Sequence, residues 1–102
     1  MRVITRKRLR EFARRHPNAA EPLEKWYHLI REAEWENLQD ARRVYPHADA
    51  VTVASGNTVT VFNIRGNKYR LIAAIHFNRQ RVYVLGLLRH CEYSKGLWKD
   101  TL

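Results

Sequence analysis

The hydrophobic residues in the first half of the chain recur with the period of an α-helix. After a short MRVI segment that fits an edge strand, Thr5 is placed to cap a helix that Pro17 ends. Four residues between them recur at positions i, i+3, i+4 and i+7, namely Leu9, Phe12, Ala13 and His16. This spacing puts the four side chains on one face and predicts an amphipathic helix.

Two more helices are predicted before residue 50. Asn18 and Glu21 have the spacing of a capping box, and the apolar positions that follow are Leu23, Trp26, Tyr27 and Ile30. A third, shorter helix is expected over Leu38–Val44, with Asn37 as its cap and Tyr45-Pro46 as its end. Aromatic residues at helical spacing usually pack in a core, so these stripes indicate packing.

From Val51 onward the helical period gives way to β-branched and aromatic residues typical of strands. Turn signals at Ser55-Gly56-Asn57, Gly66-Asn67 and Asn78-Arg79 divide this half into three or four strands of an antiparallel meander. Helices followed by strands predict an α+β fold, with the N-terminal helices packed on an antiparallel sheet. No linker or repeat interrupts the pattern, and we expect one domain over residues 1–102.

The charge of the chain is unevenly distributed. The formal net charge is +9, yet no acidic residue lies between Asp49 and Glu92. A surface with unbalanced positive charge attracts polyanions, although many basic proteins simply expose their charges to solvent. The distribution therefore favours a nucleic-acid partner.

Several other classes of protein are not indicated. The chain has no apolar run long enough for a membrane span, and its N-terminal segment has no apolar stretch of the secretory type, so we expect a cytoplasmic protein without membrane contact. Cys91 is the single cysteine and cannot form an internal disulfide. The five histidines lack metal-ligand spacing, so neither a metal nor another cofactor is expected.

The segment VFNIRGNKYRL carries cations without acids. If Gly66-Asn67 form a two-residue turn, Asn63 faces Arg70, Arg65 faces Lys68, and alternation puts all four side chains on one face. Like charges opposite one another destabilise a hairpin, so a phosphate bound there would explain them, while a solvated hairpin tip is the alternative. Because a guanidinium binds phosphate through two hydrogen bonds, Arg70 is the stronger candidate to hold it.

A second polar segment, RHCEYSK, follows the last predicted strand. Counting from a turn near Asn78-Arg79 puts Arg89 on the same face as Arg70, and Lys95 adds a further cation nearby. Histidine titrates near neutral pH, so His90 could exchange a proton there, whereas Tyr93 would need neighbouring cations to do so. A histidine beside a tyrosine is also common as a structural pair.

With these residues the chain resembles the HigB toxins, a branch of the RelE-like ribonuclease toxins of bacterial toxin–antitoxin pairs. The most specific stretch is VFNIRGNKYRLIAAI, and the resemblance continues through MRVITRKRLREF, HPNAAEPLEKWY, AEWENLQDARRVYPHAD and the terminal HCEY. The family typically has Thr-His before the final turn and Tyr-Asp within it, where this chain has Arg89-His90 and Tyr93-Ser94.

The resemblance implies a RelE-like toxin that acts as a metal-independent endoribonuclease, cleaving mRNA on the ribosome by attack of the 2′-hydroxyl, and that a HigA-like helix-turn-helix antitoxin inhibits. Carried onto matching positions, it supplies Asn63, Asn67 and Arg70 for the phosphate and His90 and Tyr93 for proton transfer. We therefore expect three catalytic residues, Arg70, His90 and Tyr93. The expected RNA-binding residues are Asn63, Arg65, Asn67, Lys68, Arg89 and Lys95.

Two alternatives stay open. The first is a basic nucleic-acid-binding module without catalysis, for which Tyr69 and Tyr83 offer stacking surfaces, although Tyr69 is expected on the face opposite Arg70. The second is a toxin of the same fold that poisons a protein target.

Overall fold

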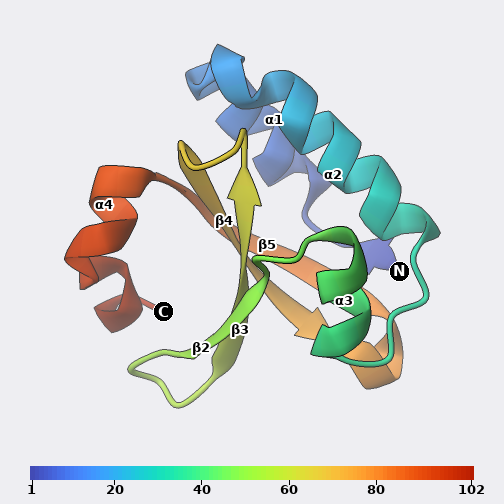
Figure 1. Cartoon of the computed structure of the whole chain (residues 1–102). Coiled ribbons are helices and arrows are strands. Elements are labelled where there is room, and N and C mark those ends of the chain that lie inside the picture. Colours follow the sequence, from blue (N-terminus) through green and yellow to red (C-terminus); the bar gives the residue numbers. More distant parts are fainter.

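Two long helices cover one face of a five-stranded sheet in the computed structural model, which describes residues 1–102 (Figure 1). The strand order is β1-β5-β4-β3-β2. Four strands form an antiparallel meander, β2 (Asp49–Thr52), β3 (Thr58–Ile64), β4 (Tyr69–His76) and β5 (Arg81–Arg89). The opening residues add β1 (Arg2–Val3) as a parallel edge strand beside β5, so the predicted α+β architecture is confirmed.

The first helix, α1 (Arg6–Arg15), starts after Thr5 and ends before Pro17, as the spacing predicted. The second, α2 (Ala20–Glu32), begins later than expected because Pro17–Ala19 form a 3₁₀ turn, η1. Its N-cap is Ala19 with no side-chain cap, so the predicted capping box is wrong. Proline at the start favours the turn, because it fixes φ and has no N–H to donate.

The short helix α3 (Leu38–Val44) has the predicted bounds. Its start is fixed by Asn37, whose side-chain oxygen accepts a hydrogen bond from the backbone N–H of Asp40 at 3.1 Å. The helical layer and the sheet bury a shared apolar core, in which the Trp26 ring of α2 packs edge-on against Phe62 of β3, with centroids 5.5 Å apart. No helix has both the length and the apolar character that crossing a membrane requires.

A β-bulge in β5 decides which side chains face each side of the sheet. Ile72 of β4 pairs with Gly86, whereas the next residue, Ala73, pairs with Val84, so Leu85 is an extra residue in β5. An extra residue reverses the in-and-out alternation of the strand beyond it. Between β4 and β5 the chain turns through η2 (Phe77–Arg79).

Two side chains at the start of α1 support the bulge. The Thr5 hydroxyl accepts a hydrogen bond from the Val84 N–H at 2.6 Å, and the Arg8 guanidinium donates to the carbonyl oxygens of Val84 and Leu85 at 3.3 and 3.2 Å. β1 pairs with β5 only at Arg81 and Val82, so these side chains occupy the free edge beyond it. Thr5 therefore bonds to the sheet instead of capping its own helix.

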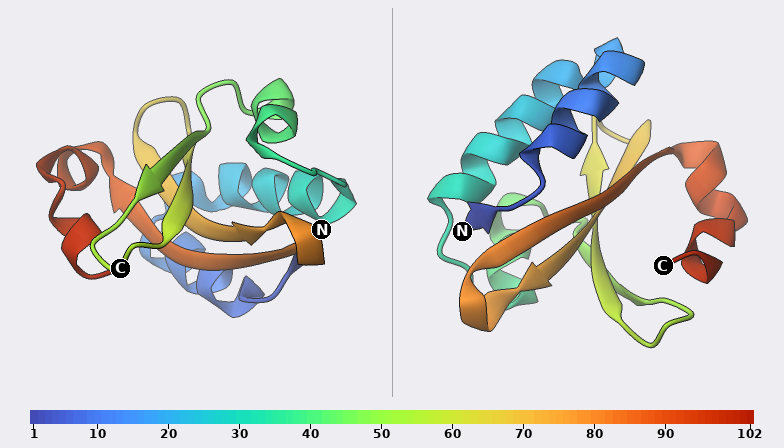
Figure 2. Two further views of the ribbon diagram at one scale, coloured as in Figure 1. Left: turned by 90° about the horizontal axis from the view of Figure 1, so that it is seen from below. Right: turned by 180° about the vertical axis from the view of Figure 1, so that it is seen from behind.

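The C-terminal segment lies on the other face of the sheet, away from α1 and α2 (Figure 2). It comprises α4 (His90–Lys95) and the 3₁₀ turn η3 (Leu97–Asp100). Trp98 anchors it, since the indole is buried in a second apolar cluster together with Val59, Val61 and Ile72 of the sheet. The sheet thus has a face covered by the long helices and a face only partly covered by the C-terminal segment.

Candidate functional site

Arg70 is a buried cation without an acidic partner. It lies on β4 with 8% of its surface exposed, and none of the ion pairs in the structure includes it. Its guanidinium donates to the backbone oxygen of Asn67 at 3.2 Å, to that of Tyr69 at 3.3 Å and to the side-chain oxygen of Asn67. Arginine is rarely buried without a counter-charge, so this position suits a group that receives an anion.

The Nε–H of Arg70 remains available. It donates to no protein group, since the bonds to Asn67 and Tyr69 use the two terminal nitrogens. The Trp26 indole nitrogen is the one buried side-chain nitrogen or oxygen without a hydrogen-bond partner. The Arg70 Nε, which has no partner either, is therefore reached by solvent. An oxyanion could approach this N–H while the turn holds the rest of the guanidinium in place.

The hairpin register around Arg70 is as predicted. Asn63 pairs with Arg70 and Ile64 pairs with Tyr69, and the Lys68 N–H donates to the Arg65 carbonyl at 3.3 Å across Gly66-Asn67. Cross-strand partners share a face, so Asn63 lies beside Arg70.

Arg65 does not join this face, and that part of the prediction is wrong. Its φ of 54° is left-handed, which breaks the alternation of β3 before the turn closes. Its side chain lines a groove beside α2 together with Glu21 and Pro22. Lys68 lies in the same turn and is exposed.

Counting residues from the turn also gave the wrong face of the sheet for Arg89. Because of the bulge at Leu85, Arg89 pairs with Tyr69 and Leu88 pairs with Arg70, so Arg89 faces the helix-covered side of the sheet. There its Nε forms an ion pair with Glu92 at 3.0 Å. The Arg89 N–H also donates to the Glu92 carboxylate, and the two bonds lower the pKa of Glu92.

Helix α4 brings Tyr93 to Arg70. The first N–H of the helix, that of His90, donates to the Lys68 carbonyl at 2.9 Å and so ties α4 to the turn. Tyr93, one turn later, lies with its ring centroid 5.5 Å from the Arg70 Cζ and is stacked on Trp98 at 5.4 Å. A guanidinium over an aromatic face is an attractive contact. His90 and Lys95 are exposed at the two ends of the helix.

Two residues near the site had no signal in the sequence. Trp98 supports the Tyr93 ring, yet a tryptophan near the end of a chain has no spacing that assigns it. His47 lines a hollow of about 530 Å³ together with Asn63, Gly66 and Asn67. It follows α3 in a loop, so only the tertiary structure places it beside the hairpin.

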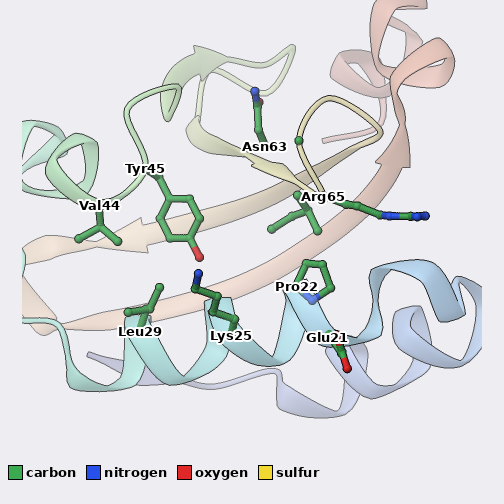
Figure 3. Close-up of a pocket in the computed structure, with 10 residues that line it drawn as sticks. Glu21, Pro22, Lys25, Leu29, Val44, Tyr45, Asn63 and Arg65 are labelled. Atoms are coloured by element: carbon green, nitrogen blue, oxygen red, sulfur yellow. The ribbon is translucent and has the colours of Figure 1, made fainter.

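A groove of about 660 Å³ separates the hairpin from α2 (Figure 3). Its lining is apolar at Leu29, Val44 and Ile64 and charged at its rim. In Figure 3 the Tyr45 hydroxyl and the Lys25 side chain point toward one another across it, while Asn63 points away from α2. Burial raises the pKa of Tyr45 to about 12, so this phenol stays neutral at physiological pH.

The fold and the site define a class of protein: a small basic α+β protein whose sheet presents a buried, carboxylate-free guanidinium beside an aromatic ring and an amide. The model of a protein family matches residues 19–96; it is described as HigB toxin, the RelE-like toxic component of a toxin–antitoxin system. Because this match covers more than half of the chain, the protein belongs to the HigB toxin family.

Individual relatives agree with this assignment. The chain is 32% identical over 95 residues to the mRNA interferase HigB of Escherichia coli O6:H1 strain CFT073, which covers 93% of this chain and 90% of that protein. It is 27% identical over 94 residues to the mRNA interferase toxin HigB of Escherichia coli K12, covering 92% and 88%. The mRNA interferase HigB of Shigella flexneri matches to the same extent. The resemblance noted from the sequence is therefore confirmed at the level of the family.

Proposed function

We propose that the protein is an mRNA interferase, a toxin that cleaves mRNA at the face carrying Arg70. Two things support the proposal: the relatives named above are mRNA interferases, and Arg70 is buried with no carboxylate to neutralise it. The second observation carries the site assignment. An unneutralised buried cation destabilises a folded protein, and binding of an anionic substrate explains why the cation is kept.

The proposed reaction uses the nucleophile that RNA already contains. The 2′-oxygen attacks the adjacent phosphorus, a base takes the 2′-hydroxyl proton, the bond from phosphorus to the 5′-oxygen breaks, and an acid protonates that leaving oxygen. The products are a 2′,3′-cyclic phosphate and a 5′-hydroxyl end. The protein has to align the attacking oxygen, stabilise the added negative charge and manage two protons, and this chemistry needs no metal.

Arg70 is placed to stabilise the charge. Its terminal nitrogens are held by Asn67, so the free Nε–H has a fixed direction before the substrate arrives. A donor that is fixed in advance stabilises a developing oxyanion without reorganisation. Asn63, the cross-strand partner of Arg70, is proposed to orient a phosphate oxygen or a base edge, with Lys68 as a mobile charge at the turn.

His90 and Tyr93 are the proposed proton carriers. Tyr93 lies over the guanidinium, so its phenol is close to any phosphate that Arg70 binds. His90 starts α4 and is exposed next to the same turn. We propose that they share the base and acid roles.

The proposed partners follow from the family. Membership of a toxin–antitoxin family implies an antitoxin; we propose that it is of the HigA-like helix-turn-helix type, that the mRNA is cut while it is translated on the ribosome, and that both events take place in the cytoplasm. A basic toxin of net charge +9 suits an acidic antitoxin segment, so the complex should weaken as salt is raised.

The test is to induce the toxin and map transcript ends. Wild type and the control Arg43→Met, which changes an arginine whose side chain is 80% exposed on α3, should both create new ends within translated messages. Arg70→Met should create none, and purified toxin should act in a translating extract but not on free RNA. Growth arrest without new ends would refute the ribonuclease and favour a protein target, and no arrest would favour a binding module.

A further inference from the structure

A second group of basic side chains lies on the same sheet face as Arg70, at the far end of β4. Arg2 of β1 pairs with Arg81 of β5, and Arg81 pairs with His76 of β4. Directly paired residues point to the same side of a sheet, so the three form one row across three strands. All three are exposed, and we call them the distal basic row.

The alternation of β4 shows that this row shares the face of Arg70. Leu71, Ala73 and Ile75 belong to the core under the helices, whereas Ile72 belongs to the cluster on the opposite face. Residues 70, 72, 74 and 76 therefore point away from α1 and α2. Val3 and Val82, the neighbours of Arg2 and Arg81, contribute to the helix-covered core, which independently places the arginines on the other face.

The distal basic row is not neutralised by the protein. No ion pair in the structure includes Arg2, Arg81 or His76. Arg79, in η2 next to the row, is a further exposed cation without an acid partner. Two arginines paired on adjacent strands repel each other, and a bound anion would relieve the repulsion.

The surface next to the row, beside the C-terminal segment, can accept bases. The Tyr83 ring lies on this face, half-buried, with its centroid 5.3 Å from that of His76 at an interplanar angle of 77°. A hollow of about 390 Å³ lies along the same face and is lined by Ala74, His76 and Leu85. Nucleobases stack on exposed aromatic rings whatever their sequence, and cations beside the rings hold the phosphates.

We propose that the distal basic row binds the phosphates of the RNA strand beyond the cleavage point, so that the strand passes over the partly exposed residues of β5, beside the C-terminal segment that covers Ile72, from Arg70 to Arg81 with a base against Tyr83. Arg70 and His76 are six residues apart on one strand, which spans roughly 20 Å. At the spacing of a stacked strand this corresponds to about six nucleotides. The inference rests on the proposed function and extends it from one phosphate to a footprint.

The test measures binding of an octanucleotide with 2′-O-methyl riboses, which cannot cleave itself, by fluorescence anisotropy at several salt concentrations. The variant is Arg2→Gln/Arg81→Gln, and the matched control is Lys7→Gln/Arg14→Gln, which removes the same charge from exposed positions on α1. The distal variant should weaken binding about tenfold and reduce the salt slope by about 1.4, the value for two lost single-strand phosphate contacts. Tyr83→Leu should weaken it further without changing the slope.

An affinity and salt slope equal to those of the control would overturn the inference, and so would a wild type that does not bind the octanucleotide. Circular dichroism establishes that each variant is folded before its binding is compared. Failure of the proposed function is a separate outcome, because it shows in the transcript-end assay, as growth arrest without new ends or as transcripts still cut by Arg70→Met, whatever the distal row does.

Discussion

Replacing Arg70 by Met should make the protein more stable and inactive. Arg70 is 8% exposed, so its charge has lost most of its hydration, and no carboxylate compensates for the loss. Methionine fills a similar space without a charge. In the variant, the side-chain oxygen of Asn67 loses the hydrogen bond from the guanidinium. Asn67 is exposed, so water can donate to this oxygen instead.

The expected gain in stability is small because opposing effects nearly cancel. Burial of an uncompensated ion costs several kcal/mol. Against it stand hydrogen bonds to a charged group, at about 1.5 kcal/mol or more each, and a cation–π contact with Tyr93 of about 0.5–2 kcal/mol. The buried methionine adds about 1.5–3 kcal/mol of apolar transfer energy. We expect a net increase in the free energy of unfolding of about 1 kcal/mol.

Urea unfolding followed by tryptophan fluorescence measures this difference, and the melting temperature should rise by about 4–8 °C. Arg43→Met serves as the control and should stay within about 0.5 kcal/mol of the wild type. Arg70→Lys should retain the charge, lose the bonds from the planar guanidinium and recover little activity. If Arg70→Met instead lowers the free energy of unfolding by 1 kcal/mol or more, Arg70 holds the hairpin together and its assignment to an anion site is refuted.

Four other changes test separate parts of the structure. Between pH 10 and 12 the unfolded chain loses the Tyr45 proton while the folded chain keeps it, so the free energy of unfolding should fall as pH rises. In urea titrations at alkaline pH, Tyr45→Phe should lose about 1 kcal/mol less than the wild type over this range. The difference is smaller than the full pKa shift implies because the ring is partly exposed. Arg65→Gly should raise the free energy of unfolding by about 0.5–1 kcal/mol by relieving the left-handed φ of 54°, and an unchanged midpoint would argue against strain. Arg89→Gln should leave transcript cleavage within about twofold, because the bulge turns this side chain from Arg70. Glu92→Ala should cost about 0.5 kcal/mol at pH 7, the low end for a helix cap because the carboxylate is largely exposed. The lowered pKa of Glu92 means that its stabilising bonds are present above pH 4.5 and are lost as pH falls through the folded-state value, so the cost should shrink in acid.

The sequence by itself determined the helices and strands and the hairpin part of the site, where Asn63 faces Arg70. Asn37 and Tyr45-Pro46 fixed α3 to the residue, because a cap and a stop are local signals. The pairing of Asn63 with Arg70 followed from counting around Gly66-Asn67, because register in a short hairpin depends on its turn. The absence of acids between Asp49 and Glu92 indicated a basic surface before any strand was placed.

Only the tertiary structure decided which cations share a face. Leu85 is one extra residue in β5, and α1 holds it in place through Thr5 and Arg8, residues far from it in sequence. That insertion turned Arg89 away from Arg70, since side chains alternate with a period of two and one residue reverses them. The placement of Tyr93 over Arg70 depends in turn on how the C-terminal segment packs on the sheet, which is a long-range contact that local spacing does not encode.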